Sequence, residues 1–278
     1  MPAAGSRPFV ILLIVLGAAT LVVDYPGRWL EGYGPLRHAS LDGWGAADLF
    51  APIFIFFLGA SIPMTGVKDR RAILDRAALM LGAGIVASGF PRFDASLWRI
   101  PGVLQRAALC YVAAASIYRA SSGDLRRRGA IVASSGTFLT LVYWLVMTHV
   151  PPPGGSAGDL SADRSLAAWI DWLLLRGHLA SARWDPDGLL SSVSSISTVL
   201  FGTVAGMCFT SGLRPLQKIL RLAGAGVAAI AGGLLWTPMF PLSRTLWSSS
   251  FVVFTGGIAS VLLALWFAIT AAGSTRRA

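Results

Sequence analysis

Apolar stretches long enough to cross a lipid bilayer recur along the whole chain and limit its fold more than any other feature. A spanning helix needs about 20 mostly apolar residues, and the sequence offers eight such stretches: 7–23, 46–66, 74–90, 100–118, 129–150, 190–210, 219–239 and 249–272. A mean hydropathy of +0.66 and a charged fraction of 13% argue against a soluble globular domain. We predict an all-α, polytopic transmembrane bundle of about eight spans, forming a single domain over residues 1–278.

The basic residues lie in short segments between the apolar stretches, so the net charge of +10 is a topology signal. Fourteen of the 23 Lys and Arg residues lie at the N-terminus or after the second, fourth, sixth and eighth stretches, and eight lie in the other connections. Because cytoplasmic loops are enriched in Lys and Arg, we predict a multi-pass protein of the cytoplasmic (inner) membrane with both termini inside. The lipid bilayer is its expected partner, and nucleic acid is not, because the basic residues form no single face.

The long connection 151–189 is predicted to lie outside. It begins with the turn-rich PPPGGSAGD and continues into SLAAWIDWLLLRGHL, where apolar residues on a helical period accompany Trp169 and Trp172. Such a pattern is typical of a short helix at the membrane interface.

Small residues at four-residue spacing occur in RLAGAGVAAIAGG, where Gly224, Ala228 and Gly232 would share one helix face. Small side chains let helices approach closely in lipid. We therefore predict a helix contact along this face.

Polar residues stand at the outer end of the second stretch, in PLRHASLDGWGAADLF. His38 is one of three histidines, and an imidazole can act as a base or nucleophile near neutral pH. Asp48 lies in the first turn of the expected helix, where the helix dipole favours a carboxylate. Both residues also have a simpler interpretation, as an interfacial histidine and a helix-start aspartate.

A second polar group lies in FPRFDASLWRIPGVLQRAALCY. Pro101 predicts a helix start, so Arg106 would lie about 8 Å deeper, beside Gln105. A charge at that depth costs several kcal/mol unless it snorkels to the interface, is paired or faces a wet cavity. Arg106 could pair structurally with Asp48 or Asp24, or it could face a polar substrate together with Arg99.

All these segments, and Asp187 in WDPDGLLS, meet the membrane at the same predicted end. We therefore expect His38, Asp48, Arg106 and Asp187 to ring one polar cavity that opens to the outside. The histidines have no metal-ligand spacing, so no metal is expected.

At these residues the sequence resembles the bacterial branch of the heparan-α-glucosaminide N-acetyltransferase family. The resemblance is carried by the string from His38 to Asp48, by RIPGVLQR, by WDPDGLLSSVSSISTVLFGTVAG and by FPLSRTLWSSSFVVFTGGIA. It covers nearly the whole chain in order.

This resemblance implies a membrane-embedded acyl-CoA-dependent N-acetyltransferase. The enzyme would move an acetyl group from cytosolic acetyl-CoA, its co-substrate, to an amino sugar or glycan on the far side. His38 corresponds to the proposed active-site residue, as base or acyl carrier, and Asp24 stands where the family has an asparagine. We expect Asp48 to orient the imidazole, and Arg99, Gln105, Arg106 and Asp187 to bind substrate.

Two alternatives remain open at this point. The resemblance implies an acidic–arginine–glycine motif before the first stretch and about three further spans after the last, so we expect a chain shortened at both ends. A non-catalytic, truncated relative is one alternative. The other is a transporter of a polar glycan, with Arg106 and Asp48 along its path. A homodimer is a further expectation.

Overall fold

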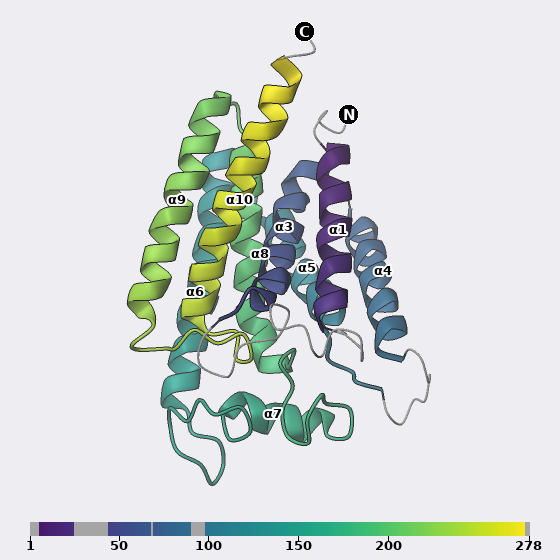
Figure 1. The fold of residues 1–278 in the computed structure, drawn as a ribbon, viewed down its shortest axis with the longest axis vertical. Helices are drawn as coiled ribbons and strands as arrows, with labels where there is room; N and C mark the ends of the chain where they lie inside the picture. The colour runs from purple at the N-terminus through teal and green to yellow at the C-terminus, as the bar shows by residue number, and fades with distance from the viewer. Residues whose placement is uncertain (1–5, 25–43, 68, 90–97, 276–278) are drawn as a thin grey trace.

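The computed structural model describes residues 6–24, 44–67, 69–89 and 98–275, and within them the chain forms helices joined by loops (Figure 1). The helices are α1 (Ser6–Asp24), the 3₁₀ turn η2 (Ala47–Leu49), α3 (Phe50–Thr65), α4 (Arg70–Gly89), α5 (Val103–Ala120), α6 (Leu125–His149), α7 (Leu166–Leu175), α8 (Leu189–Thr210), α9 (Pro215–Trp236) and α10 (Ser249–Thr275). The predicted all-helical bundle is confirmed.

Each of the eight predicted apolar stretches corresponds to a long helix, with ends that differ by a few residues. Six helical segments of the described chain are long and apolar enough to cross a membrane: Ala47–Thr65, α4, α6, α8, α9 and α10. The other two are α1, whose apolar part is short, and α5. Gln105, Arg106 and Arg119 lower the hydropathy of α5, and the cluster described below accounts for Arg106.

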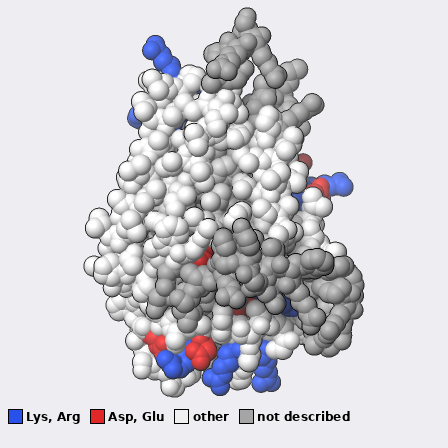
Figure 2. Space-filling view, in the orientation of Figure 1, with Lys and Arg blue, Asp and Glu red and all other residues white. Residues whose placement is uncertain are grey.

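The two ends of the described chain lie at the same end of the bundle, and α7 lies across the opposite end (Figure 1). Charged side chains gather near α7, whereas the α9–α10 side of the same face is largely uncharged (Figure 2). The N-cap hydroxyl of α7 is Ser165, whose Oγ accepts a hydrogen bond from the Ala168 amide at 3.3 Å. The short helix predicted in the 151–189 connection is therefore present.

The centre of the bundle is the contact between α3 and α8. Both helices are mostly buried, and their backbones approach closely at Gly59, Gly202 and Gly206. A Cβ atom on Gly59 would stand 2.0 Å from the Val199 carbonyl oxygen, and one on Gly202 would stand 2.0 Å from the Phe56 carbonyl oxygen. Thr203 Oγ1 also donates to the Gly59 carbonyl at 3.2 Å. Glycine is therefore required at these positions of the crossing.

We expect Gly59→Ala and Gly202→Ala each to lower the free energy of unfolding by about 1–3 kcal/mol, because the added methyl group must push two backbones apart. Thermal unfolding of the purified protein in detergent measures this. Gly224→Ala is the matched control, since a Cβ at that position meets nothing within 4 Å. Equal melting temperatures for all three variants would contradict the close crossing.

The predicted helix contact of α9 uses other small residues than those expected. Gly224 faces open space, and a Cβ on Gly232 would be 3.9 Å from its nearest neighbour. The close contacts with α10 are made by Gly226, next to the Gly257 carbonyl oxygen, and by Gly233, next to Phe254. The prediction of Gly224, Ala228 and Gly232 was wrong because several faces of α9 carry small residues, and only packing against α10 selects one.

Candidate functional site

Buried and half-buried aspartates and arginines meet at the end of the bundle where α7 lies, and we call them the aspartate–arginine cluster. They come from the C-terminal end of α1, from η2, from α5 and the segment before it, and from the loops preceding α8 and α10. The cluster comprises Asp24, Asp48, Arg99, Arg106, Asp185, Asp187 and Arg244.

Arg99 and Asp185 hold the loop before α8 against the segment before α5. Two nitrogens of Arg99 bind the two carboxylate oxygens of Asp185, one of them at 2.7 Å. Asp185 also accepts hydrogen bonds from the backbone amides of Ala180 at 2.7 Å and Asp187 at 2.8 Å. A bidentate, charge-assisted arrangement of this kind fixes geometry in addition to charge.

Arg106 lies deeper, with only 2% of its surface exposed. Its Nη2 donates to the Pro186 carbonyl at 2.7 Å and to Ser191 Oγ at 2.6 Å, and its Nε lies 3.6 Å from Asp187 Oδ1. The guanidinium also stacks over the Trp247 ring, 4.6 Å from its centroid. Its Nε and Nη1 find no hydrogen-bond partner among the described residues.

Asp187 lies between two guanidinium groups, because Arg99 Nη2 donates to its Oδ2 at 2.9 Å while Arg106 approaches its Oδ1. Burial favours the neutral acid, but the charges of Arg106, Arg99 and Arg244 outweigh it and lower the pKa of Asp187 below its usual value. Asp187 is therefore ionised at neutral pH, and its contribution to stability is lost as the pH falls through that lowered pKa.

Arg244 joins the ends of two elements that are far apart in the sequence. Its Nη2 binds Asp24 Oδ1, and its Nε lies 4.0 Å from Asp48 Oδ1. Asp48 Oδ2 also accepts a hydrogen bond from the Gly45 amide at 2.8 Å. Arg244 thus holds the described residues on both sides of segment 25–43 near one another.

The structure brings together Asp24, Asp48, Arg99, Arg106 and Asp187 of the predicted site residues. They are ion-paired with one another or with Arg244. The predicted polar cavity also included His38, so it stays a prediction. An unpaired charge in an apolar environment would cost several kcal/mol, and pairing with an opposite charge offsets much of that cost. His38 lies outside the described residues.

Two of the expected contacts were wrong. Arg106 pairs with Asp187 instead of Asp48 or Asp24, because α5 packs beside α8 and Arg244 takes both of the other carboxylates. Gln105 turns away from the cluster toward α4, where its Nε2 donates to Ser88 Oγ at 3.1 Å. One residue along a helix rotates a side chain by about 100°, so Gln105 and Arg106 face different neighbours.

Three residues of the site were not selected from the sequence: Asp185, Arg244 and Trp247. Trp247 is fully buried, has a φ of +49°, and donates from Nε1 to Thr198 Oγ1 at 3.1 Å. A bulky residue in this backbone region is uncommon and is held there by its surroundings. Arg244 and Trp247 lie in the segment FPLSRTLWSSSF. The ion pair of Arg244 with Asp24 joins residues 220 positions apart, so no local sequence pattern indicates it.

Asp171 fastens α7 to the start of α8. Its Oδ1 accepts a hydrogen bond from the Leu189 amide at 2.8 Å, which satisfies one of the free amides of that helix end. Burial raises the pKa of Asp171 to about 6, and the neighbouring charge of Asp185 adds to this while that of Arg106 opposes it.

Because the folded protein holds this proton more tightly than the unfolded chain, the stability contributed by protonated Asp171 is lost as the pH rises from about 4 to about 6. We expect Asp171→Asn, which keeps an acceptor for Leu189 without the charge, to reduce the fall in melting temperature over that range. Melting curves at several pH values measure this. The exposed Asp163→Asn is the control, and an unchanged pH profile in Asp171→Asn would contradict the assignment.

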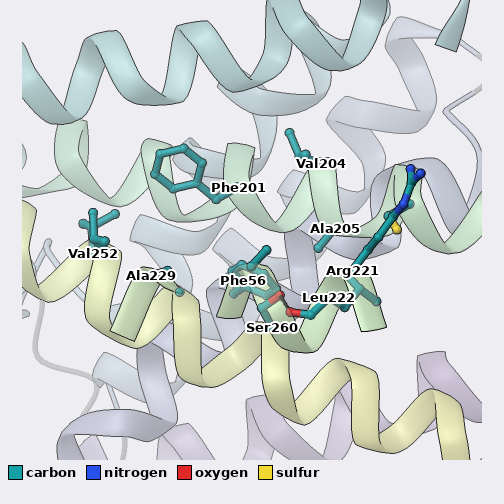
Figure 3. Close-up of a pocket in the computed structure, with 13 residues that line it drawn as sticks. Phe56, Phe201, Val204, Ala205, Arg221, Leu222, Ala229, Val252 and Ser260 are labelled. Carbon is teal, nitrogen blue, oxygen red and sulfur yellow. Dashed lines mark hydrogen bonds between the residues drawn. The ribbon is translucent and has the colours of Figure 1, made fainter. Parts of the chain in front are cut away.

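A separate cavity of about 400 Å³ lies among α3, α8, α9 and α10 (Figure 3). Its lining is apolar apart from a few groups, with Val252 at one edge and Arg221 at the other (Figure 3). Ser260 Oγ is already bonded to the Leu222 carbonyl at 3.0 Å. Acid and base groups are therefore concentrated in the aspartate–arginine cluster and not in this cavity. Within the described chain, no three His, Cys, Asp or Glu residues are arranged to hold a metal ion.

Comparison with known proteins gives two significant similarities. No family model matches the chain. Heparan-alpha-glucosaminide N-acetyltransferase of Mus musculus is 26% identical over 300 residues, which is 85% of this chain and 45% of the mouse protein. The Homo sapiens protein of the same name is 26% identical over 316 residues, 91% of this chain and 47% of its own length. The predicted resemblance is confirmed.

The chain spans about half the length of the curated relatives it matches. The similarity extends over most of this chain, and so over most of the bundle that positions the aspartate–arginine cluster.

Proposed function

We propose that this protein is a membrane acyltransferase that moves an acetyl group from acetyl-CoA to the amine of an amino sugar or glycan. The observation that carries the proposal is the similarity to two N-acetyltransferases over 85% and 91% of the chain. The polytopic helical fold supports it, because such a bundle can carry groups on both sides of a membrane.

His38 is the proposed base or acyl carrier. A protonated amine must lose a proton before it attacks a thioester, and an imidazole can take that proton or accept the acetyl group itself. The described residues that flank its segment are tied to the cluster: Asp24 is bound by Arg244, and the Gly45 amide donates to Asp48 Oδ2 at 2.8 Å.

Arg106 is the proposed group that stabilises negative charge in the transition state. Its Nε and Nη1 are buried and lack hydrogen-bond partners among the described residues. A carbonyl oxygen of the substrate could therefore accept hydrogen bonds from them. Donors already fixed before the reaction are effective in a low-dielectric site. Stacking on Trp247 and the bonds to Pro186 and Ser191 supply that fixed orientation.

The donor is proposed to enter from the end of the bundle where the termini lie, which the charge pattern predicts to be cytoplasmic. The cavity of Figure 3 supports this, because Arg221 lies seven residues into α9 from that end and offers a positive charge to the phosphates of acetyl-CoA. Val252 at its other edge is five residues after Trp247 of the site.

The test is acetyl transfer by the purified protein in detergent or lipid nanodiscs. With acetyl-labelled acetyl-CoA and glucosamine, we expect labelled N-acetylglucosamine and free CoA in equal amounts. Release of CoA without an acceptor would indicate an acyl-enzyme, and dependence on both substrates would indicate direct transfer. Absence of product with every amino sugar offered, or glycan transport by vesicles without acetylation, would overturn the proposal.

A further inference from the structure

A polar cavity of about 430 Å³ lies beside α7. It is formed between the 152–164 segment and α7, and Arg183 completes its rim. This is the end of the bundle where charged side chains gather (Figure 2). Ligand cavities of roughly 300–1,000 Å³ are typical of small-molecule sites.

The walls of this cavity are built by the local hydrogen bonds of the 152–164 segment. Asp159 Oδ1 accepts from the Ser161 amide at 3.0 Å, and its Oδ2 accepts from Arg164 Nε at 3.1 Å. On the opposite wall, Asp171 holds α7 to α8, as described above. The two walls are therefore held in place without a ligand.

Two indole rings line the cavity, those of Trp169 and Trp172. Tryptophans on an interfacial helix commonly anchor a protein in lipid headgroups, but here the neighbouring Leu173 and Leu174 are the more exposed apolar side chains, at 52% and 62%. Leu173 and Leu174 thus form the more exposed apolar surface of α7, while Trp169 and the 38%-exposed Trp172 line the cavity. Arg176 lies over the Trp172 ring at 5.6 Å and holds it in place.

The charged groups of the lining balance one another. Asp159 and Asp163 carry two negative charges, and Arg164 and Arg183 carry two positive charges. Asp159 and Arg164 are paired with each other. Asp163 and Arg183 make no side-chain hydrogen bond or ion pair within the described part of the chain, so one acceptor group and one donor group remain for a ligand.

This combination matches the chemistry of a pyranose ring. The C–H faces of a sugar carry partial positive charge and lie well against the negative face of an indole. Its hydroxyl groups donate to a carboxylate and accept from a guanidinium. The lining has no net positive charge to attract a phosphate, and an acyl chain would leave the charged groups without partners.

We propose that this cavity binds one sugar unit of a saccharide, as a second subsite for a glycan whose amino sugar is acetylated at the aspartate–arginine cluster. The inference rests on the proposed function for the role of the glycan, but saccharide binding itself does not require acetyl transfer.

Binding is tested by calorimetry with N-acetylglucosamine oligomers of one to four units and the full-length protein in nanodiscs. We expect the longer oligomers to bind, and Trp169→Ala or Trp172→Ala to weaken that binding by about 2- to 10-fold each, as expected for loss of one aromatic contact. Trp172→Phe should retain most of the affinity. Leu174→Ala is the control on the same helix and should bind as the unaltered protein does.

Melting temperatures identify variants that fail to fold, and Arg183→Gln, which removes the unpaired guanidinium of the rim, then carries the comparison and should also weaken oligomer binding. Equal affinity of the folded tryptophan-to-alanine variants, or of Arg183→Gln, and the unaltered protein for the oligomers would overturn the subsite. A second outcome would also overturn the subsite: no form of the protein binds saccharide, and the tryptophan variants no longer bind vesicles of anionic phospholipid. That outcome would assign the cavity to a lipid headgroup.

The acetyl-transfer assay separates the two proposals. If both hold, the tryptophan variants raise the KM for a trisaccharide acceptor but leave kcat and the KM for glucosamine unchanged. Saccharide binding that depends on the tryptophans, without any acetyl transfer, would uphold the subsite and overturn the proposed function. Transfer that is equally efficient on trisaccharides in all variants would uphold the proposed function and overturn the subsite.

Discussion

Asp187→Ala should lower the free energy of unfolding by about 3–5 kcal/mol, because removing one partner of a buried ion pair leaves the other charge uncompensated. The guanidinium of Arg106 is fully buried, and Asp187 is its neighbouring carboxylate at 3.6 Å. Arg99 would keep its bonds to Asp185. Unfolding of the purified protein, followed by thermal or denaturant titration in detergent, measures the loss.

The control is Asp159→Ala, which removes a carboxylate from the exposed pair with Arg164. An exposed ion pair contributes about 0–1 kcal/mol, so this variant should unfold almost as the unaltered protein does. The double variant Arg106→Met with Asp187→Leu should recover part of the stability, since no charge is then left buried. Similar small losses for Asp187→Ala and Asp159→Ala would show that the cluster is hydrated and open.

His38→Ala should lower the rate of acetyl transfer by about 100-fold or more, since loss of a positioned acid–base group typically costs 10²–10⁴-fold. Transfer is measured with labelled acetyl-CoA and glucosamine at saturating concentrations. We expect little change in melting temperature, because the predicted role of His38 is chemical.

The matched control is His149→Ala. His149 is the last residue of α6, is exposed, and lies 3.2 Å from the Leu145 carbonyl through its Nδ1. Its removal should leave the rate within about 2-fold, in line with a surface position that contributes no proton transfer. Unchanged transfer in His38→Ala would assign the chemistry to another group and leave Arg106 and Asp48 as the residues to vary next.

The spans were predicted correctly because the length of an apolar stretch is a property of the local sequence. Every residue of a spanning helix must satisfy its backbone within the segment, so the sequence of that segment alone indicates the helix. The same reasoning applies to α7, whose Ser165 cap and apolar period both lie within a few residues. Pro101 was also informative, although it precedes the Gly102 N-cap instead of entering the first turn of α5.

The partner of Arg106 could not be predicted from the local sequence. The depth of Arg106 in the membrane predicted that its charge snorkels, is paired or faces a wet cavity, and it is paired. Several aspartates belong to the segments predicted at the same end of the bundle, and nothing in RIPGVLQR distinguishes among them. The choice of Asp187 depends on α5 lying against α8, which brings Ser191 and Pro186 to the same guanidinium.

By itself, then, the sequence determined that this chain is a polytopic helical bundle and that Asp48, Arg106 and Asp187 lie at one end of it, since both follow from the cost of placing polar groups in lipid. The tertiary structure decided which charges pair, that Gln105 faces α4, and that Arg244 joins Asp24 to Asp48. Pairing is a property of neighbouring helices, and their order around the bundle is set by close contacts such as those of Gly59 and Gly202, which no single segment contains.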